Sequence, residues 1–74
     1  MIKTFDELFA RMRSDNRKCG VVLLKYTKWR EEEPGTEEED KRAYSLMGYL
    51  SCLMEEDYIS VEEFDALTKL LWNP

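Results

Sequence analysis

Histidine is absent from this sequence of 74 residues, and other residues on which functional sites depend are scarce. Without histidine, neither a Ser-His-Asp type triad nor a histidine-ligated metal site can be assembled. Cys19 and Cys52 lie far apart in the sequence and do not have the spacing of a zinc site. Gly20, Gly35 and Gly48 stand singly, which excludes a glycine-rich phosphate loop. We therefore expect a protein that is not an enzyme and that binds no metal or other cofactor.

Long apolar runs are also lacking. The start, from Met1 to Phe5, has no signal-peptide pattern, and no stretch approaches the roughly 20 apolar residues of a membrane span. Two cysteines are too few for a disulfide framework, so we expect Cys19 and Cys52 to be free thiols. Free thiols fit a reducing compartment, and we expect the protein in the cytoplasm. Hydrophobic residues make up 43% of the chain and aromatic residues 12%, enough to build a core. Residues 1–74 are expected to form a single small domain.

Charge is distributed unevenly along the chain. Residues 1–30 hold eight basic and three acidic residues, a net charge of +5, whereas residues 31–74 hold three basic and thirteen acidic residues, a net charge of −10. In residues 31–40, called the acidic segment below, seven of the ten side chains are acidic. Such charge governs encounter and partner choice rather than fold. The basic residues of the first half are expected to pair mainly with the acidic segment or with residues 55–57.

Three helices are predicted from their start signals. Thr4 and Glu7 fit a capping box, as do Thr36 with Glu39 and Ser60 with Glu63. Apolar residues follow each box at helical spacing, which predicts helices at about 5–14, 37–56 and 61–72. The inward stripe of the long helix consists of Ala43, Leu46, Met47, Leu50, Leu53 and Met54.

The stretch from 20 to 29 is ambiguous. Its β-branched and aromatic residues favour a strand by propensity. Since no second strand is predicted to pair with it, we prefer a further helix at about 20–32, with Val22, Tyr26 and Trp29 on one side and Lys25 and Lys28 on the other. The expected fold is thus an all-α compact bundle of three to four helices, and the alternative is α+β with residues 20–29 as a strand.

A second surface is predicted on the long helix, opposite its apolar stripe. Lys41, Ser45, Gly48 and Cys52 recur there at helical spacing, and the small residues permit another helix to approach closely. We expect that helix to belong to the same bundle, with Cys52 slow to react. The alternative is self-association of a small dimerising helical module, which would give a short chain a shared core.

The candidate binding residues fall into two groups. The acidic segment ends one predicted helix with a run of carboxylates, where the helix dipole disfavours negative charge. Negative charge that is kept at a helix C-terminus in spite of the dipole indicates a functional surface. We therefore expect a basic partner protein to bind the acidic side chains of the segment: Glu31, Glu32, Glu33, Glu37, Glu38, Glu39 and Asp40. The alternative is that these residues are merely solvated. The alternative binding face is Lys25, Tyr26, Lys28 and Trp29, where a nucleic-acid binder would use the basic half of the chain.

The chain has two acidic stretches, Glu31 to Asp40 and Glu55 to Asp57. In these stretches, in its length and in its lack of catalytic residues, it resembles small acidic inhibitors made by phages and mobile elements, anti-CRISPR proteins among them. The resemblance concerns overall character. It implies an inhibitor in the bacterial host cell whose carboxylates occupy a basic nucleic-acid-binding surface of an effector. Because the net charge of the chain is −5, we do not expect the chain itself to bind nucleic acid.

Overall fold

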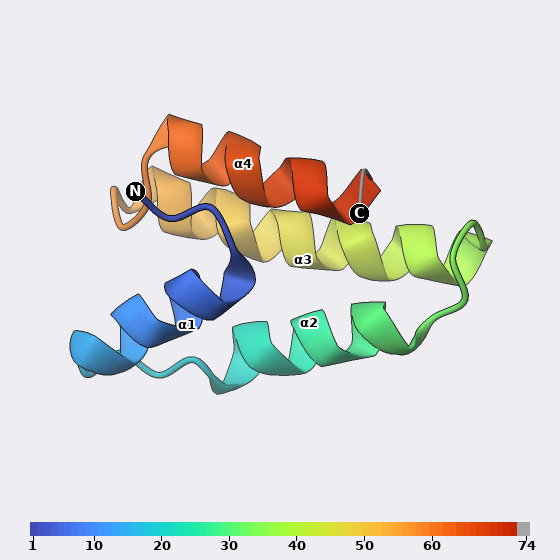
Figure 1. The fold of residues 1–74 in the computed structure, drawn as a ribbon, viewed down its shortest axis with the longest axis horizontal. Coiled ribbons are helices and arrows are strands. Elements are labelled where there is room, and N and C mark those ends of the chain that lie inside the picture. Colours follow the sequence, from blue (N-terminus) through green and yellow to red (C-terminus); the bar gives the residue numbers. More distant parts are fainter. Residues whose placement is uncertain (73–74) are drawn as a thin grey trace.

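The structure, a computed structural model, describes residues 1–72 and contains four helices in this range (Figure 1). They are α1 (Phe5–Ser14), α2 (Gly20–Glu31), α3 (Glu37–Glu55) and α4 (Val61–Trp72). The prediction of an all-α bundle is confirmed, with boundaries close to those expected. The strand alternative for residues 20–29 is wrong, because this stretch is helical along its whole length.

The capping boxes at Thr4 and Ser60 are present in full, whereas at Thr36 the hydroxyl caps α3 but the Glu39 carboxylate accepts from the N–H of Gly35 instead of Thr36. These caps explain why three of the helices begin where they do. The backbone N–H of Glu7 donates to Thr4 Oγ1 at 3.2 Å, and the N–H of Glu39 donates to Thr36 Oγ1 at the same distance. At α4, the N–H of Glu63 donates to Ser60 Oγ at 3.1 Å. These bonds satisfy N–H groups that a helix start leaves without partners.

Helix α2 has no such start signal, since its first turn carries no side-chain cap and no acidic residue. Its placement comes from tertiary packing instead. Val22 is buried, while Tyr26 and Trp29 are half-buried against the core. Tyr26 lies 4.7 Å from Phe5 and 5.5 Å from Phe9, measured between ring centroids, so an aromatic cluster joins α2 to α1.

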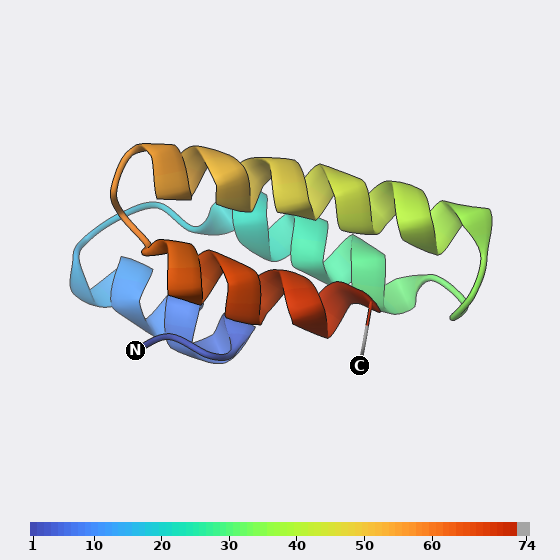
Figure 2. The same ribbon diagram turned by 90° about the horizontal axis from the view of Figure 1, so that it is seen from above.

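The core is made mainly by α1 and α3. Phe5, Leu8, Phe9 and Met12 of α1 are all buried, as predicted for its apolar face. On α3 the predicted stripe faces inward, with Met47 and Met54 half-buried and Ala43, Leu46, Leu50 and Leu53 fully buried. Helix α3 packs against both α2 and α4. Figure 2 shows α1 and α4 lying on the same side of the pair formed by α2 and α3.

A buried carboxylate ties the N-terminus to α4. Glu63 is only 5% exposed, and its Oε2 accepts a hydrogen bond from the backbone N–H of Ile2 at 2.7 Å. The guanidinium of Arg11 donates to both carboxylate oxygens of Glu63, at 3.2 and 2.8 Å. Ile2 itself is buried in the core. The side chain that closes the capping box of α4 therefore also anchors α1 and the residues before it.

Among residues 1–72, no helix is both long enough and apolar enough to cross a membrane.

Candidate functional site

The acidic segment joins α2 to α3 and lies at one end of the molecule (Figure 1). Its backbone is held by local hydrogen bonds. The hydroxyl of Thr36 donates to the carbonyl of Glu33 at 2.8 Å, and the N–H of Gly35 donates to a carboxylate oxygen of Glu39 at 2.9 Å. Gly35 has a φ of +81°, a conformation that suits glycine. The turn is therefore ordered by its own side chains.

Three of the seven acidic side chains in this segment have partners. Glu32 lies 3.8 Å from Arg42, and Glu38 lies 3.4 Å from Lys41 in an exposed pair. The carboxylate of Glu39 accepts the hydrogen bond from the N–H of Gly35. Within residues 1–72, the remaining four side chains are exposed and form neither an ion pair nor a side-chain hydrogen bond: Glu31, Glu33, Glu37 and Asp40.

The expectation that the basic first half would neutralise the acidic regions is met only in part. Arg17 pairs with Glu56 at 2.8 Å, and Arg11 pairs with Glu63 on α4. The described ion pairs of the acidic segment involve Arg42 and Lys41, which belong to the second half of the chain. The first half thus contributes no ion pair to the acidic segment in the described part of the chain, and the segment keeps most of its negative charge.

A small hollow borders the acidic segment. It has a volume of about 150 Å³ and is lined by Trp29, Arg30, Glu32, Pro34 and Glu39. The indole Nε1 of Trp29 is buried and has no hydrogen-bond partner within residues 1–72. Trp29 and Pro34 supply the apolar lining of this hollow, which is bordered by Arg30 and by the carboxylates of Glu32 and Glu39 and has room for one side chain.

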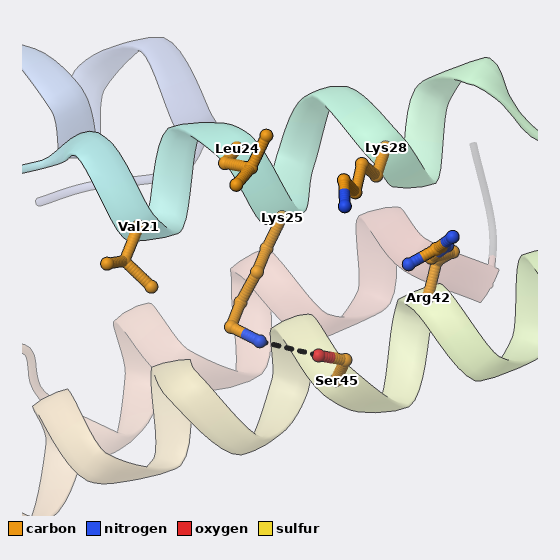
Figure 3. Close-up of a pocket in the computed structure, with 6 residues that line it drawn as sticks. All are labelled: Val21, Leu24, Lys25, Lys28, Arg42 and Ser45. Atoms are coloured by element: carbon orange, nitrogen blue, oxygen red, sulfur yellow. Dashed lines mark hydrogen bonds between the residues drawn. The ribbon is translucent and has the colours of Figure 1, made fainter.

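The alternative binding face does not form one surface. Tyr26 and Trp29 turn toward the core, where their ring centroids are 5.9 Å apart. Lys25 and Lys28 instead line a groove between α2 and α3, with a volume of about 170 Å³ (Figure 3). Lys25 Nζ donates to Ser45 Oγ at 2.7 Å. The aromatic and basic residues of this set therefore point to different sides of α2.

Sequence reasoning missed the other members of this groove. Val21 and Leu24 are exposed on α2, and Arg42 extends from α3 toward Lys28 (Figure 3). Their proximity depends on how α2 and α3 pair. The only signal in the sequence was that apolar residues occur on every side of α2, more than one buried face requires.

The ridge on α3 that was expected to pack within the bundle faces solvent. Lys41, Ser45, Gly48 and Cys52 are all exposed. A Cβ atom placed on Gly48 would meet nothing within 4 Å. That expectation is wrong, because α2 and α4 pack on the inward and lateral sides of α3 and leave its outer side uncovered. Cys52 is consequently accessible rather than protected.

Within residues 1–72 no three His, Cys, Asp or Glu side chains are grouped so as to hold a metal ion. Glu63 is the buried acidic side chain of this range. Burial by itself raises the pKa of Glu63, but hydrogen bonds from Arg11, Ile2 and Ser60 outweigh it and lower the pKa to about 2. Glu63 is thus a stable anion with a structural role.

Neither a family model, nor a curated protein, nor a solved structure was found to match this chain.

Proposed function

We propose that this chain is a non-catalytic interaction protein whose acidic segment binds a basic, nucleic-acid-binding surface of another protein. The observation that carries the proposal is the set of four exposed carboxylates without partners, at Glu31, Glu33, Glu37 and Asp40. They lie in an ordered turn and in the helix ends that flank it, at one end of the molecule (Figure 1). Because the backbone that carries them is ordered, these carboxylates replace phosphates in a basic channel without the cost of ordering a loop, and only their side-chain rotamers are fixed on binding.

The resemblance to small acidic phage and mobile-element inhibitors names the class of partner. The proposed setting is the cytoplasm of a bacterial host cell, and the proposed partner is a nucleic-acid-binding effector, a CRISPR effector among the candidates. The charged segment steers association with the basic surface, and the hollow beside Trp29 accepts a side chain of that surface.

The test uses a panel of purified bacterial nucleic-acid-binding effectors, each loaded with a fluorescent oligonucleotide. The chain is expected to displace the oligonucleotide from at least one effector, with an affinity that falls steeply as salt rises. The quadruple variant Glu31→Gln, Glu33→Gln, Glu37→Gln and Asp40→Asn should associate about tenfold more slowly and show a flatter salt dependence, because charges at the rim act mainly through steering.

The quadruple variant should remove the charges of the acidic segment without changing its structure. None of its four side chains forms a hydrogen bond or ion pair within residues 1–72, so the turn and the cap at Thr36 and Glu39 are retained. A control variant, Asp6→Asn with Glu62→Gln, removes two exposed charges from other parts of the molecule and should behave as the unaltered chain. Equal binding by the quadruple variant would exclude the acidic segment. Failure to displace the oligonucleotide from any effector, or retention of the chain on the oligonucleotide itself, would contradict the proposed function.

A further inference from the structure

The outer side of the α2 and α3 pair carries apolar residues that no other part of residues 1–72 covers, beside the basic residues Lys25, Lys28 and Arg42 of the groove. Val21 and Leu24 of α2 are 57% and 55% exposed and line the groove that runs beside Ser45 (Figure 3). On the α4 side of α3, Tyr44 is 59% exposed and packs against Trp72 with ring centroids 5.2 Å apart. Exposed apolar residues thus flank α3 on both sides, which is typical of an interaction surface.

Between these flanks, α3 presents a line of five exposed residues, called the outer stripe: Lys41, Ser45, Gly48, Cys52 and Glu55. Their alternating spacings of four and three keep them on one side of the helix. The open space around Gly48 lets a second helix backbone come close at the centre of the stripe.

The charges of the outer stripe decide which partner fits. Lys41 and Glu55 stand seven residues before and seven residues after Gly48, and they carry opposite charges. A two-fold axis at Gly48 would set α3 antiparallel to a copy of itself, with Lys41 of each chain facing Glu55 of the other. An isologous interface requires such self-complementarity.

We propose that a second copy of this chain occupies this surface, forming an antiparallel dimer through the outer stripe with its two-fold axis at Gly48. Val21, Leu24 and Tyr44 supply the apolar area around the axis, and the Lys41 and Glu55 pairs at both ends fix the direction. The dimer uses residues outside the acidic segment, and Lys41 would exchange its exposed pair with Glu38 of that segment for Glu55 of the other chain. Its axis at Gly48 is distinct from the surface of the function proposed above.

The first test is sedimentation of the full chain over a range of concentrations. Twice the monomer mass is expected at high concentration, and a monomer at every concentration up to about 1 mM would overturn the proposal. Gly48→Glu should remain monomeric, because it places a charged side chain on the axis. It should still fold, since nothing lies near this position and glycine is a poor helix former.

Charge exchange tests the direction of the helices. Lys41→Glu alone and Glu55→Lys alone should each weaken the dimer about tenfold, because each creates two like-charged contacts across the axis. The double variant should restore dimerisation, which a mere loss of folding would not allow. Loss of the dimer in the double variant, or no effect of either single change, would contradict the antiparallel register.

Cross-linking tests the position of the axis. Gly48→Cys in a Cys52→Ser background should form a disulfide between chains under mild oxidation. The native Cys52 should not, because two Cys52 residues would lie about 12 Å apart along the helices, beyond the reach of a disulfide. Cross-linking through Cys52 but not through position 48 would move the axis and refute the register.

Discussion

The carboxylate of Glu63 is expected to make the stability of this fold dependent on pH in the acidic range. Its pKa falls from the ordinary value of 4.5 to about 2, because hydrogen bonds from Arg11, Ile2 and Ser60 outweigh the effect of burial. A group with a lowered pKa in the folded state stabilises that state above its unfolded pKa. The stabilisation is therefore complete above about pH 5 and is lost as the pH falls toward 2.

The size of the effect follows from the shift. At 1.36 kcal/mol for each pKa unit the full shift would be worth about 3 kcal/mol. Arg11 is 36% exposed in its side chain, so solvent screens the pair and we expect about 2 kcal/mol. Glu63→Gln should lower the free energy of unfolding at pH 7 by at least this amount, because the neutral amide also places a donor among the donors of Arg11 and Ile2.

The assay is urea unfolding of both proteins at several pH values between 7 and 2. Their difference in free energy should shrink toward low pH, where Glu63 itself becomes protonated. The pKa of Glu7 is also lowered, by hydrogen bonds to Lys3 and Thr4, but its titration is common to both proteins and cancels in the difference. Glu62→Gln is the matched control and should change stability little. A difference between the Glu63→Gln variant and the unaltered chain that stays constant down to pH 2 would refute this reasoning.

Two other predictions concern the core and the thiols. Leu46→Ala should lower the free energy of unfolding by about 3 kcal/mol, measured by chemical unfolding, because Leu46 is completely buried. Leu24→Ala, at an exposed position, should lower it far less. Similar losses for the two variants would contradict the assignment of the inward face of α3. In single-cysteine variants, at concentrations too low for self-association, Cys52 should react with a thiol reagent faster than the half-buried Cys19. The reverse order would show that the outer side of α3 is covered.

Local signals in the sequence were sufficient to predict most of the helices. Each capping box places a hydroxyl residue and a glutamate three positions apart, and the interaction needs nothing beyond one turn of chain. The starts of α1, α3 and α4 could therefore be predicted from Thr4, Thr36 and Ser60. Helix α2 has no side-chain cap, and its apolar residues lie on every side of the helix. Residue propensity therefore favoured a strand while no clear helical periodicity opposed it, and the helix is set by packing against α1 and α3.

Contacts between distant residues were beyond sequence reasoning. Glu63 was predicted as part of a cap, but its bonds to Ile2 and Arg11 join residues more than fifty positions apart. The ridge of Ser45, Gly48 and Cys52 was correctly placed opposite the apolar stripe, yet the pattern could not show whether another helix of the same chain covers it. The acidic segment was found easily, whereas the choice of its four side chains without partners depended on the positions of Lys41 and Arg42.

The two proposed surfaces can be separated by experiment because they use different residues of one hairpin. The acidic segment extends into the first turn of α3, which begins at Glu37, and the axis of the proposed dimer lies eleven residues after Glu37, at Gly48. An antiparallel dimer would place its two Glu37 residues, and with them the two acidic segments, toward opposite ends, about 33 Å apart along the helices. Neither segment would then cover the other, and each would reach its own basic surface. Gly48→Glu should accordingly abolish dimerisation while leaving the displacement of an oligonucleotide by each chain intact. The quadruple variant of the acidic segment should show the opposite behaviour, and a single variant that removed both activities would mean that the two surfaces are one.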